Sequence, residues 1–229
     1  MTVNLLQSIR MVTLSHRGFS RQLLLAAAVG LLAGCSFFSP KPDLARNFVL
    51  RAMPSKISPA PPPDPTLTLV VYPVEVADYL NRPQMVTLLQ GSQVNFDEYD
   101  RWAEPMGSGF SRVLAQDIAL LADSTHVAAF PLSPGFSREF EVYTQVLQFD
   151  GVSGGNVTLR VSWRITGLGG KPNYTVHDTS FTRKAEIGTD PVNGYVDALN
   201  GLVGDLAREI VSAVPAARAA KAAQTTAGS

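Results

Sequence analysis

Apolar and polar residues alternate most regularly over residues 157–166. The apolar positions are Val157, Leu159, Val161, Trp163 and Ile165, and the positions between them are polar. A period of two predicts a strand with one buried face and one solvent-facing face. Weaker patterns rich in β-branched and aromatic residues predict further strands at residues 67–74, 85–89, 93–96, 127–130, 140–149 and 174–185.

Apolar residues recur at helical spacing in two other segments. The first predicted helix runs from Pro105 or Met106 to about Leu121. The second follows Asp190, which can cap its first turn, and Pro191, whose missing N–H costs nothing there. Its apolar face comprises Tyr195, Leu199, Leu202, Val203, Leu206 and Ile210. We expect Pro215 to end this helix.

The order of these elements predicts one domain over residues 67–214. A strand–helix–strand unit is followed by a β-meander, which gives a mixed sheet covered by two main helices. The fold class is therefore α/β, with α+β as the alternative. Because crossover connections are right-handed, residues 127–130 should pair in parallel with a strand that precedes the first helix.

Two segments beside this domain have the composition of irregular chain. Residues 35–66 include the proline-rich run 58–65, which favours extended polyproline conformation and predicts a tether. The apolar group 48–50 lies within residues 35–66, before the proline-rich run, and we expect this group to dock on the domain. Residues 215–229 are rich in alanine and lack large apolar side chains, which predicts a disordered tail.

Residues 1–34 have the features of a secretory signal peptide. Basic residues, among them Arg17 and Arg21, precede an apolar run over residues 23–32. This run is too short to span a bilayer, which takes about 20 apolar residues. The sequence Leu32-Ala33-Gly34-Cys35 then resembles the bacterial lipobox, whose cysteine is acylated before cleavage in front of it.

The lipobox resemblance implies that Cys35 becomes the lipidated first residue of the mature protein. Cys35 is also the one cysteine of the sequence, so the chain forms no internal disulfide. Ser36 after the cysteine fits delivery to the outer membrane of a Gram-negative bacterium, where the domain would face the periplasm. The covalent lipid is the only non-protein group that we expect.

Charge and motifs give little support to other functions. Residues 1–34 hold three of the 19 basic residues and no acidic residue, so the mature chain has 16 against 19 and a net charge of −3. Nucleic-acid binding normally needs a basic patch, and we expect none. The sequence contains no phosphate loop, nucleophile elbow or dinucleotide fingerprint. His126 and His177 lack metal-ligand spacing. We therefore predict neither an enzyme nor a metal site.

One acidic group leaves an alternative open. It consists of Asp97, Glu98, Asp100 and Glu104. We expect a solvated loop that leads into the first helix. A carboxylate pair for glycoside hydrolysis remains the alternative interpretation.

Two short motifs carry a resemblance to a known family. Residues 79–84, Tyr-Leu-Asn-Arg-Pro-Gln, and residues 101–105, Arg-Trp-Ala-Glu-Pro, are similar to signatures of the ABC-type transport auxiliary lipoproteins, the PqiC (YmbA) family. The resemblance runs from Cys35 to about Val214. The glycines of Gly107-Ser108-Gly109 depart from it, because better helix formers would be expected there.

The resemblance implies a non-catalytic lipoprotein subunit of an intermembrane lipid transport system. Its partner would be a protein with MCE domains that forms a periplasmic lipid conduit, and the assembly would support envelope integrity. A periplasmic lipid-binding carrier is the alternative. Assembly into a homo-oligomer stays open.

The motif residues have a binding interpretation and a structural one. As a docking surface for the partner, the candidates are Tyr79, Leu80, Asn81, Arg82, Pro83 and Trp102. Tyr, Arg and Trp are enriched at binding hot spots. In the structural interpretation, Trp102 fills the core and Arg82 binds backbone carbonyls or Glu104.

Overall fold

The computed structural model describes residues 44–54, 60–89 and 92–227. Residues from Ala45 onward pack as one compact unit. The predicted signal peptide and Cys35 lie outside the described residues. Within the three described ranges, no helix is both long and apolar enough to cross a membrane.

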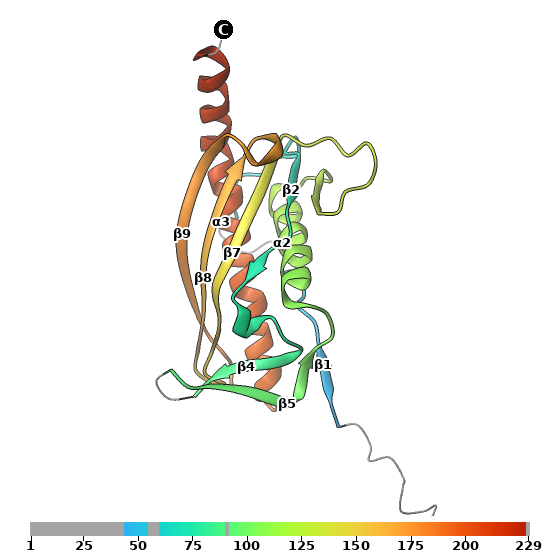
Figure 1. Cartoon of the computed structure of the whole chain (residues 1–229), viewed down its shortest axis with the longest axis vertical. Coiled ribbons are helices and arrows are strands. Elements are labelled where there is room, and N and C mark those ends of the chain that lie inside the picture. Colours follow the sequence, from blue (N-terminus) through green and yellow to red (C-terminus); the bar gives the residue numbers. More distant parts are fainter. Residues whose placement is uncertain (1–43, 55–59, 90–91, 228–229) are drawn as a thin grey trace, which may run out of the picture. The chain divides into compact units, whose positions relative to one another are not determined.

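A six-stranded mixed sheet forms the larger part of the domain (Figure 1). Its strands run in the order β6 (Val127–Ala129), β2 (Leu69–Val71), β7 (Phe140–Gly151), β8 (Asn156–Thr166) and β9 (Asn173–Lys184), and the short β3 (Glu75–Val76) also pairs with β7. β2 is parallel to β6 and β7, whereas β7, β8 and β9 form an antiparallel meander. The predicted meander and the predicted parallel crossover are both confirmed.

A second sheet of three strands lies at one end of the domain. β5 (Val94–Trp102) is its central strand, flanked by the parallel β1 (Arg46–Phe48) and the antiparallel β4 (Gln84–Leu88). We predicted a single sheet and a loop at the acidic residues, and both predictions were wrong. Asp97, Glu98 and Asp100 lie within β5. β1 pairs with β5 from Asp100 to Trp102, and Arg46 forms an ion pair with Asp100.

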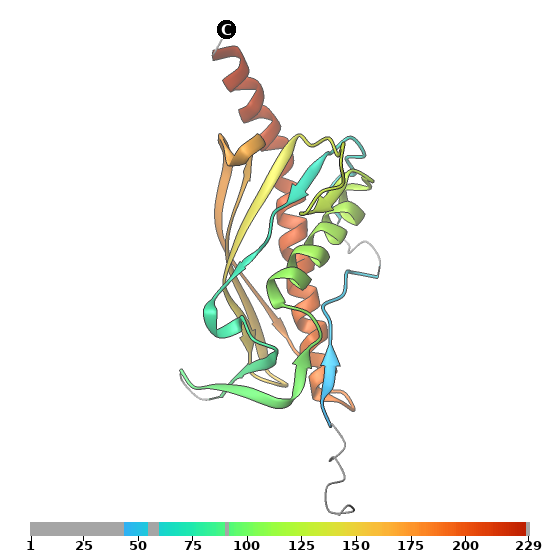
Figure 2. The same ribbon diagram turned by 45° about the vertical axis from the view of Figure 1, so that its right-hand side comes forward.

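Two helices pack against one face of the large sheet (Figures 1 and 2). α2 spans Met106–Ala122 and α3 spans Pro191–Ala227. The predicted starts of both helices are confirmed. The Asp190 carboxylate accepts a hydrogen bond from the backbone N–H of Val192 at 3.0 Å, which caps α3 as expected.

The core lies between the helices and the inner face of the sheet. All five apolar residues of the alternating β8 pattern are buried, and Trp163 retains 1% exposure. They pack with the apolar faces of α2 and α3 in one continuous cluster. The described residues also form the short 3-10 helices η2 (Asp78–Leu80) after β3 and η3 (Leu168–Gly170) between β8 and β9.

The prediction of a disordered tail from residue 215 was wrong. α3 continues through Pro215 to Ala227 and extends beyond the end of the sheet (Figure 1). Proline removes one helical hydrogen bond, but the following turn is held by tertiary contacts. Ala217 is fully buried, and Arg218 forms ion pairs with Asp64 and Glu139. Alanine, the strongest helix former, then favours continuation.

The folded unit also begins earlier than residue 67. Leu50 is buried, and Arg112 donates to its carbonyl oxygen at 3.0 Å, as expected for a docked apolar group. The backbone N–H of Met53 donates to Asp117 at 2.8 Å. Asp64 in the proline-rich run donates its N–H to the carbonyl oxygen of Ala122, the last residue of α2. The part of the predicted tether from Ala45 therefore belongs to the domain.

Candidate functional site

The two motif segments, which are separated by 16 residues in sequence, meet at the end of the small sheet. The N–H of Trp102 donates to the carbonyl oxygen of Pro83 at 2.7 Å, and Gln84 lies opposite Arg101 in the β4–β5 pairing. Together the segments line a groove of about 310 Å³, which we call the motif groove. Its lining residues are Asn81, Arg82, Pro83, Trp102, Ala103, Glu104 and Pro105.

Three of the six predicted site residues hold this region to the core. Leu80 and Trp102 are buried, at 2% and 7% exposure, so Trp102 packs as the structural interpretation proposed. The Tyr79 hydroxyl donates to the carboxylate of Asp150 on β7 at 2.5 Å. Burial and this neighbouring carboxylate raise the pKa of the Tyr79 hydroxyl.

The other three predicted residues reach the surface. Asn81 and Pro83 are exposed, and Arg82 is half-buried. The Arg82 guanidinium lies over the ring of Phe96, 3.8 Å from the ring centroid. Its Nε has no hydrogen-bond partner among the residues that the structure describes. The structural interpretation gave backbone carbonyls or Glu104 as partners of Arg82. Glu104 forms an ion pair with Arg112.

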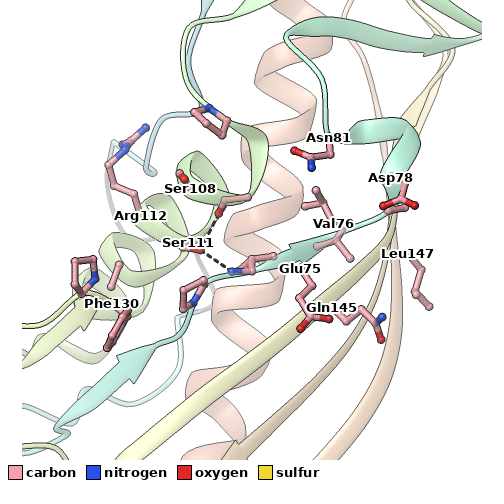
Figure 3. Close-up of a pocket in the computed structure, with 18 residues that line it drawn as sticks. Glu75, Val76, Asp78, Asn81, Ser108, Ser111, Arg112, Phe130, Gln145 and Leu147 are labelled. Carbon is pink, nitrogen blue, oxygen red and sulfur yellow. Dashed lines mark hydrogen bonds between the residues drawn. The ribbon is translucent and has the colours of Figure 1, made fainter.

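A larger cleft of about 1130 Å³ adjoins the motif groove (Figure 3). Asn81 and Pro105 line both, so the two form one continuous surface. β3, η2, the first turns of α2, the residues after β6 and the middle of β7 form the walls of the cleft. Its apolar side chains include Val76, Phe130 and Leu147.

Charged groups of both signs lie around the cleft. Glu75 and Asp78 stand on the side of β3 and η2, whereas Arg112 stands on α2 (Figure 3). The hydroxyl of Ser111 joins the two sides, because it donates to the carbonyl oxygen of Gly107 and accepts from the N–H of Val74. This arrangement suits a ligand or partner segment with both apolar and polar groups.

Gly107 explains the departure of the sequence from good helix formers. A Cβ at this position would lie 2.6 Å from the carbonyl oxygen of Val74, so only glycine allows the helix to approach the chain just before β3 this closely. The cleft residues Ser111, Arg112 and Phe130 were absent from our sequence-based candidates. The unexpected glycine at the start of α2 was the one indication of them.

The acidic group carries structural contacts. Asp97 accepts the N–H groups of Tyr99 and Asp100, and Asp100 binds Arg46 through two contacts of 2.6 and 2.8 Å. Across the described ranges, no cluster of three or more His, Cys, Asp or Glu residues could hold a metal ion.

A scan against protein families matches the model of the ABC-type transport auxiliary lipoprotein component over residues 48–211. The match covers both motif segments and most of the folded unit. The chain belongs to this family. The family is an auxiliary component of ABC-type transport and is not a known family of enzymes, and its lipoprotein character implies a membrane-associated location.

Solved structures share the fold at low sequence identity. The protein XCC0632 from Xanthomonas campestris, of the DUF330 family, is 12% identical with a TM-score of 0.59, covering 81% of this chain and all of its own. An uncharacterized protein is 17% identical with a TM-score of 0.56, covering 74% of this chain and 98% of its own. A search of curated proteins found no match.

Proposed function

We propose that this protein is a non-catalytic outer-membrane lipoprotein subunit of an MCE-type intermembrane lipid transport system. The lipid on Cys35 anchors it, and the domain docks on the periplasmic conduit through the motif groove and the adjoining cleft. The observation that carries this proposal is the meeting of both family motifs in one groove. Family membership supports the auxiliary role in transport.

The exposed members of the motif groove are suited to contact with a partner. Asn81, Pro83 and Ala103 present polar and apolar atoms at the surface, while Trp102 and Leu80 fix the backbone behind them. Preorganised surfaces lose less conformational entropy on binding, which favours affinity. The half-buried Arg82 adds a cation whose Nε has no partner within the described part of the chain.

Photo-crosslinking in cells tests the docking surface. A photoreactive phenylalanine analogue replaces Ala103, and the matched control replaces Ser180, which is exposed on the outward face of β9. We expect a protein with MCE domains to be captured from position 103 and not from position 180. Recovery of no MCE-domain or transport subunit from position 103, at normal protein level, would contradict the proposal.

The anchor has its own test. Cys35→Ser should leave the domain folded but release it from the membrane fraction, because no acyl chain is then attached. We expect the barrier defect of a deletion strain to persist with this variant. Restoration of the barrier by exported, soluble protein would show that the anchor is dispensable.

The cleft favours one alternative function, a periplasmic lipid-binding carrier. Its volume and the apolar side chains of Val76, Phe130 and Leu147 would accommodate part of an acyl chain. If the protein is a carrier, mass spectrometry of the intact, unlipidated domain under native conditions should show phospholipid bound in stoichiometric amounts. The same spectra report the number of copies, which tests assembly into a homo-oligomer.

A further inference from the structure

Four segments far apart in sequence gather at one end of the domain (Figures 1 and 2). They are β1, the β4–β5 hairpin, the β7–β8 turn and the β9–α3 loop. Contacts join these segments. Arg46 of β1 forms an ion pair with Asp190, just before α3. The Tyr195 hydroxyl of α3 donates to the carbonyl oxygen of Val86 on β4 and accepts from the N–H of Gly151 on β7. We call this the β1 end.

The loops of the β1 end expose large apolar side chains. Leu89 in the β4–β5 hairpin is 48% exposed, Val152 in the β7–β8 turn 46% and Ile187 in the β9–α3 loop 72%. Ile187 packs beside the β7–β8 turn. A Cβ placed on Gly154 of this turn would lie 3.1 Å from Cγ1 of Ile187. Single exposed apolar residues such as Leu168 occur elsewhere on the domain, whereas apolar side chains that group on one surface are typical of a site that contacts a membrane or a partner.

The length of chain before the domain indicates that the β1 end lies near a membrane. Ala45, where the folded unit begins, follows Cys35 by only ten residues, and β1 starts at the next position. Ten residues reach at most about 35 Å when fully extended. α3 has 37 residues and is therefore about 55 Å long. The C-terminal end of this helix thus lies farther from β1 than ten residues can span.

We infer that the β1 end is a membrane-contact surface whose loops insert apolar side chains into the interfacial layer of the phospholipid leaflet that holds the anchor. This inference rests on the proposed function, because it takes Cys35 as the site of lipidation. Apolar side chains that enter the interfacial layer add to the membrane binding that a covalent lipid provides. Membrane contact also fixes orientation, with the β1 end toward the lipid.

A label at the β1 end tests this surface in the lipidated, mature protein. Ile187→Cys is labelled with the polarity-sensitive fluorophore NBD and reconstituted in vesicles of phosphatidylethanolamine and phosphatidylglycerol. The matched control is Leu168→Cys in η3, which is 59% exposed and lies at the opposite end of the β8–β9 pair. Cys35 does not react, because its thiol is acylated.

Brominated phospholipids should quench the label at position 187 at least about twofold more than the label at position 168. Equal quenching at both positions, in protein that sediments with the vesicles, would overturn the inference and leave the anchor intact. Protein that fails to sediment would instead overturn the anchoring that the proposed function requires.

Two further measurements separate lipid from other occupants. A blue shift of the label at position 187 in the unlipidated Cys35→Ser protein, in solution without vesicles or detergent, would show burial by a second copy or another protein, and it would overturn the inference. The label at Val152→Cys should repeat the result at position 187. Circular dichroism of each labelled variant confirms that the fold is intact.

Discussion

The two sheets of this domain are stabilised in different ways. The large sheet buries one apolar face under α2 and α3, and its strands β7, β8 and β9 are long and regular. The small sheet has few buried apolar residues. Polar contacts support it, chiefly Arg46 with Asp100 between β1 and β5, and Asp97 with two backbone N–H groups of β5. Beside the small sheet, Tyr79 joins η2 to Asp150 of β7.

This difference means that the large sheet supplies most of the stability, whereas the small sheet shapes the proposed binding surface. Apolar burial is non-directional and contributes most of the free energy of folding. Polar contacts contribute less, but each fixes one geometry. The motif groove lies at the end of the small sheet, so changes to its exposed residues Asn81, Pro83 and Ala103 should alter the surface more than the fold.

Trp163→Ala should have the largest effect. Trp163 is 1% exposed on the inner face of β8, and truncation of a buried Trp costs about 3–5 kcal/mol of unfolding free energy. Chemical denaturation measures this loss. The control Val176→Ala, 60% exposed on the neighbouring strand, should change stability by less than about 0.5 kcal/mol. A loss below about 1 kcal/mol for Trp163→Ala would contradict the role of the large sheet as the main core.

Tyr79→Phe should have an intermediate effect. It removes the hydrogen bond to the Asp150 carboxylate, and Asp150 is 1% exposed, so the cost should be about 1–3 kcal/mol. Denaturation of this variant and of Tyr99→Phe, half-exposed on β5, gives the comparison. Equal stability of the two variants would show that the Tyr79 contact does not hold η2 to β7.

Asp117 should make stability depend on pH. Its side chain is fully buried in α2, accepts the Met53 N–H, and has one oxygen without a partner within the described ranges. Burial raises the pKa of this carboxyl to about 6, from 3.8. The neutral form therefore stabilises the folded state below pH 4, and this contribution is lost as pH rises through 6.

Denaturation of wild type and Asp117→Asn across pH 4–7 measures this contribution. We expect the wild type to lose stability relative to the variant as pH rises, because Asn does not ionise and still accepts the Met53 N–H. Parallel curves for the two proteins would contradict a raised pKa at Asp117.

Arg82→Ala should have the smallest effect on stability. It removes the contact of the guanidinium with the Phe96 ring, which contributes about 0.5–1 kcal/mol. The same variant should reduce crosslinking from position 103 more strongly, since Arg82 lines the motif groove. Arg82→Lys, which keeps the charge, is the control. Unchanged crosslinking with Arg82→Ala would remove Arg82 from the docking surface.

The sequence predicted the large sheet well, because the period of two in residues 157–166 reflects burial of one face. The start of α3 was equally clear from Asp190 and Pro191. Both depend on local patterns. The continuation of α3 past Pro215 depends instead on Arg218 reaching Asp64, 154 positions earlier in the chain, and no local pattern contains such a contact.

The candidate site was predicted in part. Family resemblance identified residues 79–83 and Trp102, but their meeting in one groove depends on the pairing of β4 with β5. The cleft depends on the close approach of α2 to β3 at Gly107, which appears in the sequence only as an unfavourable helix residue. Shape arises from long-range packing, and short motifs do not contain it.

The attachment of β1 has a mechanical consequence. β1 is the first element after the predicted anchor, and it pairs in parallel with β5, while Arg46 binds both Asp100 and Asp190. Tension on the preceding chain would act along β1 and load its three-residue pairing in shear. The force would then pass into β5, the strand that ends at Trp102 and the motif groove. Movement of the membrane relative to a docked partner would thus strain the binding surface before it strained the large sheet.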